Sequence, residues 1–107
     1  MSGLSITEVN ADLNIVVKGR KLDDDSALLL RFNKGATGVR TATQIAAGEE
    51  NNLNIRIYGE KGAVIWRQEE PNSLLVRVYG QPNELYRAGW AYLSDAARLN
   101  TRTPWGH

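Results

Sequence analysis

Apolar and polar residues alternate along most of the chain with a period of two, which is typical of β-strands that have two different faces. The alternation is clear between Ser26 and Phe32, where Leu28, Leu30 and Phe32 fall on one side of the expected strand. Similar alternation occurs elsewhere along the chain. Extended segments are predicted at residues 6–17, 26–32, 39–46, 53–58, 63–67 and 74–79.

Short turns separate these segments. The Asn-Lys-Gly sequence at 33–35 predicts a tight hairpin in which Gly35 takes a positive φ angle. The Gly-Glu-Lys-Gly sequence at 59–62 predicts a second reversal, and Pro71-Asn72 and Gly80–Asn83 give further turn signals. Strands joined in this way predict one open, mainly antiparallel sheet of about five or six strands.

A single helix is expected, at Leu93–Asn100, with Ser94 as its N-cap. The predicted fold class is therefore α+β and β-rich, with a short C-terminal helix. A sheet must cover its apolar face, and one short helix is too small to do this. We therefore expect either that the sheet curls on itself or that a second copy of the chain supplies the missing layer.

Composition limits the classes of function. The chain has 107 residues, the length of one ordinary domain, and it contains no cysteine, which excludes disulfides and a thiol nucleophile. Thirteen basic and twelve acidic residues are interspersed and give a net charge of +1, which argues against a nucleic-acid partner. Apolar runs such as Ala27–Leu30 are far shorter than the ~20 residues of a membrane span. No secretory signal is recognisable at the N-terminus, so a cytoplasmic location is expected.

Few residues have the arrangement that catalysis or metal binding requires. No GxGxxG loop lies between a strand and a helix, so no dinucleotide-binding site is expected in this chain. Asp23-Asp24-Asp25 permits a metal-site interpretation, but consecutive side chains diverge and repel, and a solvated loop is favoured. His107 is the single histidine and the last residue, where no partner fixes it as a general base. Neither catalytic nor metal-binding residues are predicted.

The aromatic residues allow more than one interpretation. Tyrosines and tryptophans on a sheet can stack against sugars or bases, but more often they fill a core or an interface. Arg56 and Arg77 lie near Tyr58 and Tyr79 and predict a face that is partly apolar and partly charged. Such a face suits a contact with another protein.

The sequence resembles the second domain of the glucose–fructose oxidoreductase/inositol dehydrogenase (Gfo/Idh/MocA) family. The similar blocks, distinctive in combination, are ITEVNADLNIVVKGR, DDDSALLLRFNKGATGV, QIAAGEENNL, IYGEKGAVIWRQEEPNSLLV and YLSDAARLNTRTPWGH. This resemblance implies an open antiparallel sheet, one face of which commonly forms the subunit interface. It also implies hydride transfer between a nicotinamide and a sugar or cyclitol in a full-length parent, which binds NAD or NADP in a separate Rossmann domain.

The family's catalytic lysine and histidine lie outside the region of resemblance, and neither can be placed on a residue of this sequence. By analogy with the family, the residues that would face a substrate are Gln44, Asn51, Arg102 and His107. The first hypothesis is therefore a substrate-side and oligomerisation portion of an NAD(P)-dependent oxidoreductase, excised or naturally shortened and inactive alone. The alternative is a stand-alone binding or assembly module without catalysis.

The large side chains on both predicted sheet faces also lead to an expectation about assembly. Contiguous apolar surface beyond a few hundred Å² is seldom left in water. We therefore expect a homodimer, or a higher even-numbered oligomer, formed through one sheet face, with a Rossmann domain as a further possible partner. A charged substitution at Trp66 or Tyr79 is expected to weaken this oligomer.

Overall fold

The computed structural model describes residues 3–100. These residues form strands and a short helix, as the sequence predicts, together with a 3-10 turn. The strands are β1 (Ile6–Asn14), β2 (Asp25–Phe32), β3 (Thr37–Thr43), β4 (Asn54–Tyr58), β5 (Gly62–Arg67), β6 (Ser73–Val78) and β7 (Glu84–Arg87). The 3-10 turn η1 is Asn33–Gly35, and the helix α1 is Asp95–Leu99. The β-rich, antiparallel character of the fold and its short helix are confirmed.

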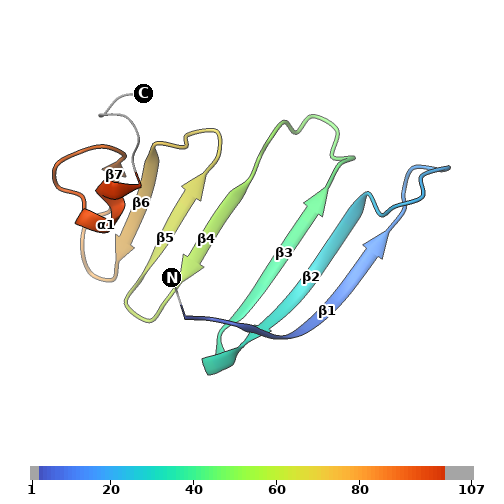
Figure 1. The fold of residues 1–107 in the computed structure, drawn as a ribbon, viewed down its shortest axis with the longest axis horizontal. Helices are drawn as coiled ribbons and strands as arrows, with labels where there is room; N and C mark the ends of the chain where they lie inside the picture. The colour runs from blue at the N-terminus through green and yellow to red at the C-terminus, as the bar shows by residue number, and fades with distance from the viewer. Residues whose placement is uncertain (1–2, 101–107) are drawn as a thin grey trace. The chain divides into compact units, whose positions relative to one another are not determined.

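The prediction of one sheet with five or six strands is wrong for the described residues, because the strands form two hydrogen-bonded sheets. One sheet has the order β1-β2-β3 and the other the order β4-β5-β6-β7 (Figure 1). Each sheet belongs to its own compact unit, the first ending at Gly48 and the second beginning at Glu49. The strand β7 was not predicted, because it has only four residues and no β-branched side chain.

The first unit is an antiparallel meander with one apolar face. Directly opposite residues of an antiparallel pair share a face, and Val9 is opposite Leu30, as Ala11 is opposite Leu28. Gly35 has φ of +81°, which confirms the predicted turn between β2 and β3. The apolar face of this sheet carries Val9, Ala11, Leu13, Leu28, Leu30 and Ala42, with Ser26, Gly38 and Arg40 among them.

The second unit contains the predicted hairpin at 59–62, in which the Gly59 amide donates to the Gly62 carbonyl over 2.8 Å. Gly62 also has a packing reason that the turn pattern did not reveal. A Cβ atom at this position would lie 2.1 Å from the carbonyl oxygen of Arg77 on the neighbouring strand. The hydrogen that glycine carries instead lets β5 and β6 approach each other.

The helix α1 confirms the predicted N-cap. The Ser94 hydroxyl accepts a hydrogen bond from the Ala97 amide over 3.4 Å, and Asp95 occupies the first turn. Only five residues are helical, fewer than the eight predicted from Leu93 to Asn100. Every residue of this helix is exposed, so it covers little of the second unit's sheet.

Burial in the two units is unusual for a folded chain. Within residues 3–100 no apolar side chain is buried, and the two buried residues are polar: Asp24 and Ser73. Each sheet is one layer thick, so apolar side chains on both of its faces stay at least partly accessible. Apolar burial is the main stabilising contribution in folding, and within residues 3–100 the two sheets provide little of it.

Candidate functional site

Four arginines, one from each strand, share one face of the second unit's sheet. The register places Arg56 opposite Ile65, and Arg67 opposite Asn54. It also places Arg77 opposite Ala63, and Arg87 opposite Ser73. We call this surface the arginine face; it carries Asn54, Arg56, Tyr58, Ala63, Ile65, Arg67, Ser73, Leu75, Arg77, Leu85 and Arg87. No strand position on it is acidic.

One of these arginines is held by an acidic partner. The Arg87 guanidinium lies 3.3 Å from a Glu70 carboxylate oxygen and also donates to the Ser73 hydroxyl. The Ser73 hydroxyl donates to the same Glu70 oxygen over 2.8 Å, so this buried serine is fully engaged. Among the described residues, no acidic side chain lies within ion-pair distance of Arg56, Arg67 or Arg77. Three guanidinium groups on this face therefore have their charge uncompensated.

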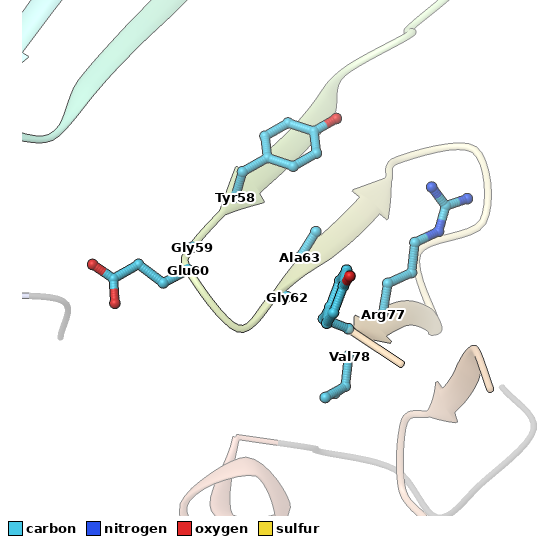
Figure 2. Close-up of a pocket in the computed structure, with 8 residues that line it drawn as sticks. Tyr58, Gly59, Glu60, Gly62, Ala63, Arg77 and Val78 are labelled. Carbon is cyan, nitrogen blue, oxygen red and sulfur yellow. The ribbon is translucent and has the colours of Figure 1, made fainter. Parts of the chain in front are cut away.

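A shallow hollow of about 280 Å³ lies at the hairpin end of the arginine face. Figure 2 shows Tyr58, Ala63 and Arg77 projecting to one side of the strands and Val78 projecting to the other. Tyr79 lines the same hollow and is 93% exposed, and Tyr58 is 70% exposed. Two accessible aromatic rings beside a guanidinium are typical of the centre of a protein contact.

The opposite face of this sheet is apolar across three strands. It carries Ile55, Ile57, Val64, Trp66, Leu74, Val76 and Val78, and at its edge Glu84 and Tyr86. Trp66, on this apolar face, lies on the other side of the sheet from Arg77 and the hollow that Tyr79 lines. Charged substitutions at Trp66 and Tyr79 were both expected to weaken one interface, but the two side chains belong to different surroundings.

Tyr86, at the β7 edge of this apolar face, belongs to a small aromatic cluster. Its ring meets that of Tyr92 edge-on at 5.7 Å, and Tyr92 stacks on Trp90 at 6.2 Å. The Tyr86 hydroxyl donates to Glu84 over 2.6 Å, and this hydrogen bond raises the pKa of Tyr86 above its usual value. A second open hollow, of about 290 Å³, lies beside Tyr86 and Tyr92 and is lined also by Glu84 and Leu85.

The polar face of the first unit's sheet has the opposite charge. We call it the acidic face; it carries Glu8, Asn10, Asp12, Asn14, Asp25, Ala27, Leu29, Arg31, Thr37, Val39, Thr41 and Thr43. Its single cation, Arg31, lies 3.6 Å from Glu8. Leu29 and Val39 lie opposite each other in the register and are 57% and 73% exposed. This face therefore has an apolar row with acidic residues on neighbouring rows.

Asp24 corrects the interpretation of residues 23–25 as a solvated acidic loop. Its carboxylate accepts from the Val16 amide over 2.8 Å and from the Val17 amide over 3.1 Å, and Arg20 donates to it over 3.2 Å. The side chain is 1% exposed. The Val16 hydrogen bond, with those of Val17 and Arg20, lowers the pKa of Asp24 despite burial. Asp24 thus closes the loop between β1 and β2 and is not available to a metal ion.

The four residues predicted to face a substrate do not form a described site. Gln44 follows β3 in the first unit, where its amide donates to the Asp24 carbonyl over 2.9 Å, and its side chain is exposed. Asn51 lies in an exposed loop of the second unit. Arg102 and His107 lie outside the described residues. Neither described hollow contains Gln44 or Asn51, and the substrate role of all four residues stays a prediction.

Two of the four arginines on the arginine face, Arg56 and Arg77, are recognised from the sequence as part of a mixed face. Arg67 and Arg87 are not. The missing signal was the register: residues equidistant from the 59–62 turn pair with each other, which places Arg67 opposite Asn54 and on the face of Arg56. Pairing the residues at equal distances from each turn would have placed the four arginines on one face.

The described residues thus form two single-layer antiparallel sheets with one short helix, and the second sheet carries the arginine face. The sequence profile described as the GFO/IDH/MocA C-terminal domain matches residues 1–65. The chain belongs to this family. Its relatives are oxidoreductases, and the similarity covers a C-terminal part of them.

Three relatives show the extent of the similarity. An uncharacterised oxidoreductase, YfiI, of Bacillus subtilis is 31% identical over 95% of this chain and 26% of its own length. An oxidoreductase from Sinorhizobium meliloti has a solved structure that covers 99% of this chain and 31% of that protein, with a TM-score of 0.91 and 41% identity. An inositol dehydrogenase homolog from Azotobacter vinelandii, solved with NADH and myo-inositol, covers 98% of this chain and 28% of that protein, with a TM-score of 0.89 and 28% identity.

The chain thus spans about a quarter to a third of the length of these proteins. Over residues 3–100, no helix is long and apolar enough to cross a membrane.

Proposed function

We propose that the chain is the substrate-side and oligomerisation portion of an NAD(P)-dependent oxidoreductase that acts on a sugar or cyclitol. The observation that carries this proposal is the similarity over 98% of the chain to a protein solved with NADH and myo-inositol. In that arrangement a separate domain supplies the cofactor site and the catalytic groups. This chain would supply a wall of the substrate pocket, with Gln44 and Asn51 as its candidate polar contacts.

The assembly half of the proposal is a homodimer, or a higher even oligomer, that buries one sheet face of each copy. It is supported by the absence of any buried apolar side chain within residues 3–100. Stable interfaces bury about 1,200–2,000 Å² in total, and each described sheet has accessible side chains on both faces. Two-fold symmetry is the commonest way for such surfaces to pair.

The test of the substrate half is a replacement experiment. In the Azotobacter vinelandii inositol dehydrogenase homolog, this chain replaces the corresponding segment. NADH formation by the hybrid is then followed with a panel of cyclitols and sugars. We expect turnover of at least one of them. A matched hybrid with Gln44→Ala and Asn51→Ala should keep its NAD affinity and show a KM on the order of 10-fold higher, equivalent to about 1.4 kcal/mol.

A hybrid that binds NAD normally but oxidises no member of the panel would contradict the substrate half. That result would favour the alternative, a stand-alone binding or assembly module without catalysis. The chain alone is expected to show no saturable binding of NAD(H) or NADP(H) by calorimetry, because its sequence has no glycine-rich turn leading into a helix that could receive a pyrophosphate. Binding at micromolar affinity would overturn this expectation.

A further inference from the structure

The arginine face and the acidic face share one layout with opposite charges. On the arginine face, Ile65, Leu75 and Leu85 are consecutive partners in the register and form an apolar row. Arg56 continues this row onto β4. Arg77 lies on the row to one side, and Arg67 and Arg87 lie on strand positions to the other side. Apolar residues at the centre with charged residues around them are typical of a protein interface.

The acidic face repeats this arrangement with the opposite sign. Its central row is Asn10, Leu29 and Val39, which are partners across the three strands. Glu8 lies on the row to one side, together with Arg31, and Asp12 lies on the row to the other side. Asp25 lies one row beyond Asp12. Both Leu29 and Val39 are more than half exposed, so they can reach a partner without rearrangement.

We propose that the arginine face of one copy of this chain docks on the acidic face of a second copy. This inference rests on the assembly half of the proposed function and specifies its contact. The apolar rows would pack against each other. Arg56, Arg67 and Arg77, which have no acidic partner within the described residues, would gain carboxylate partners.

Charge also disfavours the pairing of either face with a second copy of itself. Two arginine faces brought together would place six uncompensated guanidinium groups in one interface, and two acidic faces would gather carboxylates in the same way. Like charges at an interface cost several kcal/mol. Opposite charges steer the two copies together and fix their register. The hollow at Tyr58 and Tyr79 adds accessible aromatic surface at the hairpin end of the arginine face.

The test is a charge exchange measured by sedimentation equilibrium of the chain. The first variant, Arg56→Glu with Arg77→Glu, cancels the net positive charge of the arginine face, where Arg67 and Arg87 remain. The second variant, Glu8→Lys with Asp12→Lys, makes both faces basic. We expect each variant alone to associate at least about 100-fold more weakly than the wild type, and an equimolar mixture of the two to associate again. Recovery in the mixture also shows that both variants are folded.

Lys18→Glu with Lys21→Glu is the matched control for the first variant. It changes the net charge equally at exposed residues of the loop between β1 and β2, outside both faces, and its association should match the wild type. The association should also weaken as the salt concentration rises from about 0.05 M to about 0.5 M, because salt screens exposed charges.

Three results would overturn the inference. If both variants associate as tightly as the wild type, this contact is refuted, but assembly itself is not. A second variant that associates with itself as tightly as the wild type would show that the acidic face is not part of the contact. A wild-type chain that stays monomeric at tens of micromolar would refute both the contact and the assembly half of the proposed function. The substrate half depends on the turnover of the hybrid enzyme and would be unaffected.

Discussion

The two units use different buried polar residues to hold an irregular segment against a sheet. Both are single-layer antiparallel meanders with one apolar face, and in both a buried polar residue ties an irregular segment to the sheet. In the first unit Asp24 accepts two backbone amides and an arginine. In the second unit Ser73 links Glu70 to Arg87 across two strands. The comparison teaches that polar networks can order the ends of a sheet even where its apolar side chains stay accessible.

The two units differ in the group on which their local packing depends. The second unit depends on backbone contact at Gly62, and the first unit on a side-chain carboxylate at Asp24. The two can therefore be perturbed separately, and residue-resolved hydrogen exchange can report which sheet has opened.

Gly62→Ala should have the largest effect. The added Cβ meets the Arg77 carbonyl at 2.1 Å, and because both are backbone-bound, β5 and β6 must separate. We expect a loss of about 1–3 kcal/mol and faster amide exchange in β4–β6, with β1–β3 unchanged. Gly59→Ala is the control, because its nearest contact would be at 3.8 Å and should be tolerated. Equal effects from both substitutions would refute the packing argument.

Trp66→Asp and Tyr79→Asp should separate the two faces of the second unit. Trp66 lies on the apolar face and donates from Nε1 to the Pro71 carbonyl over 3.0 Å, so Trp66→Asp should destabilise the sheet by about 1–3 kcal/mol. Tyr79 is 93% exposed, so Tyr79→Asp should leave the stability within about 0.5 kcal/mol. Thermal unfolding of both variants checks this, and a reversed order would contradict the assignment of faces.

Asp24→Asn should open the first unit's loop and spare the second unit. Asparagine keeps the size of the side chain but loses the negative charge that holds Val16, Val17 and Arg20, so exchange at the two amides should rise. Because folding lowers the pKa of Asp24, its stabilising contribution is present above the unfolded pKa, about 4, and is lost as the pH falls towards the folded pKa. This acid-dependent loosening should be absent in Asp24→Asn, while the neighbouring variant Asp23→Asn should retain it.

Ser94→Ala should have the smallest effect. The substitution removes a long cap bond from a helix of five exposed residues. We expect a loss of at most about 0.5 kcal/mol, at the low end for N-caps, with no change of exchange in either sheet. Ser94→Asp, which retains a capping oxygen, should match the wild type. A large effect from Ser94→Ala would mean that the helix supports more of the second unit than its exposure indicates.

The sequence predicts the strands better than their organisation. A period of two identifies β1–β6, and the Ser94 cap locates the helix start, because both signals are local. β7 was missed because Glu84–Arg87 is short and lacks β-branched residues. Its existence depends on pairing with β6, which is a tertiary effect. The role of Asp24 was also inaccessible, because a carboxylate that accepts amides from an irregular loop leaves no periodic trace.

The candidate site shows the same limit. Arg56 and Arg77 were recognised as part of a mixed face, but the four-arginine surface appears only when the register brings the strands together. The family itself was recognisable from sequence blocks. Gln44 and Asn51 rest on analogy, and the local geometry around each of them does not assign a ligand.

The absence of buried apolar side chains within residues 3–100 has a calorimetric consequence. The heat-capacity change of unfolding and the dependence of the unfolding free energy on denaturant both scale with the surface that unfolding exposes. A single-layer sheet exposes little new apolar surface, so the separated chain should unfold with a heat-capacity change well below the usual ~12–15 cal/mol/K per residue. It should show a correspondingly shallow transition. In a longer parent protein, the contribution of this segment to the heat-capacity change of unfolding would then arise where other layers meet these sheets.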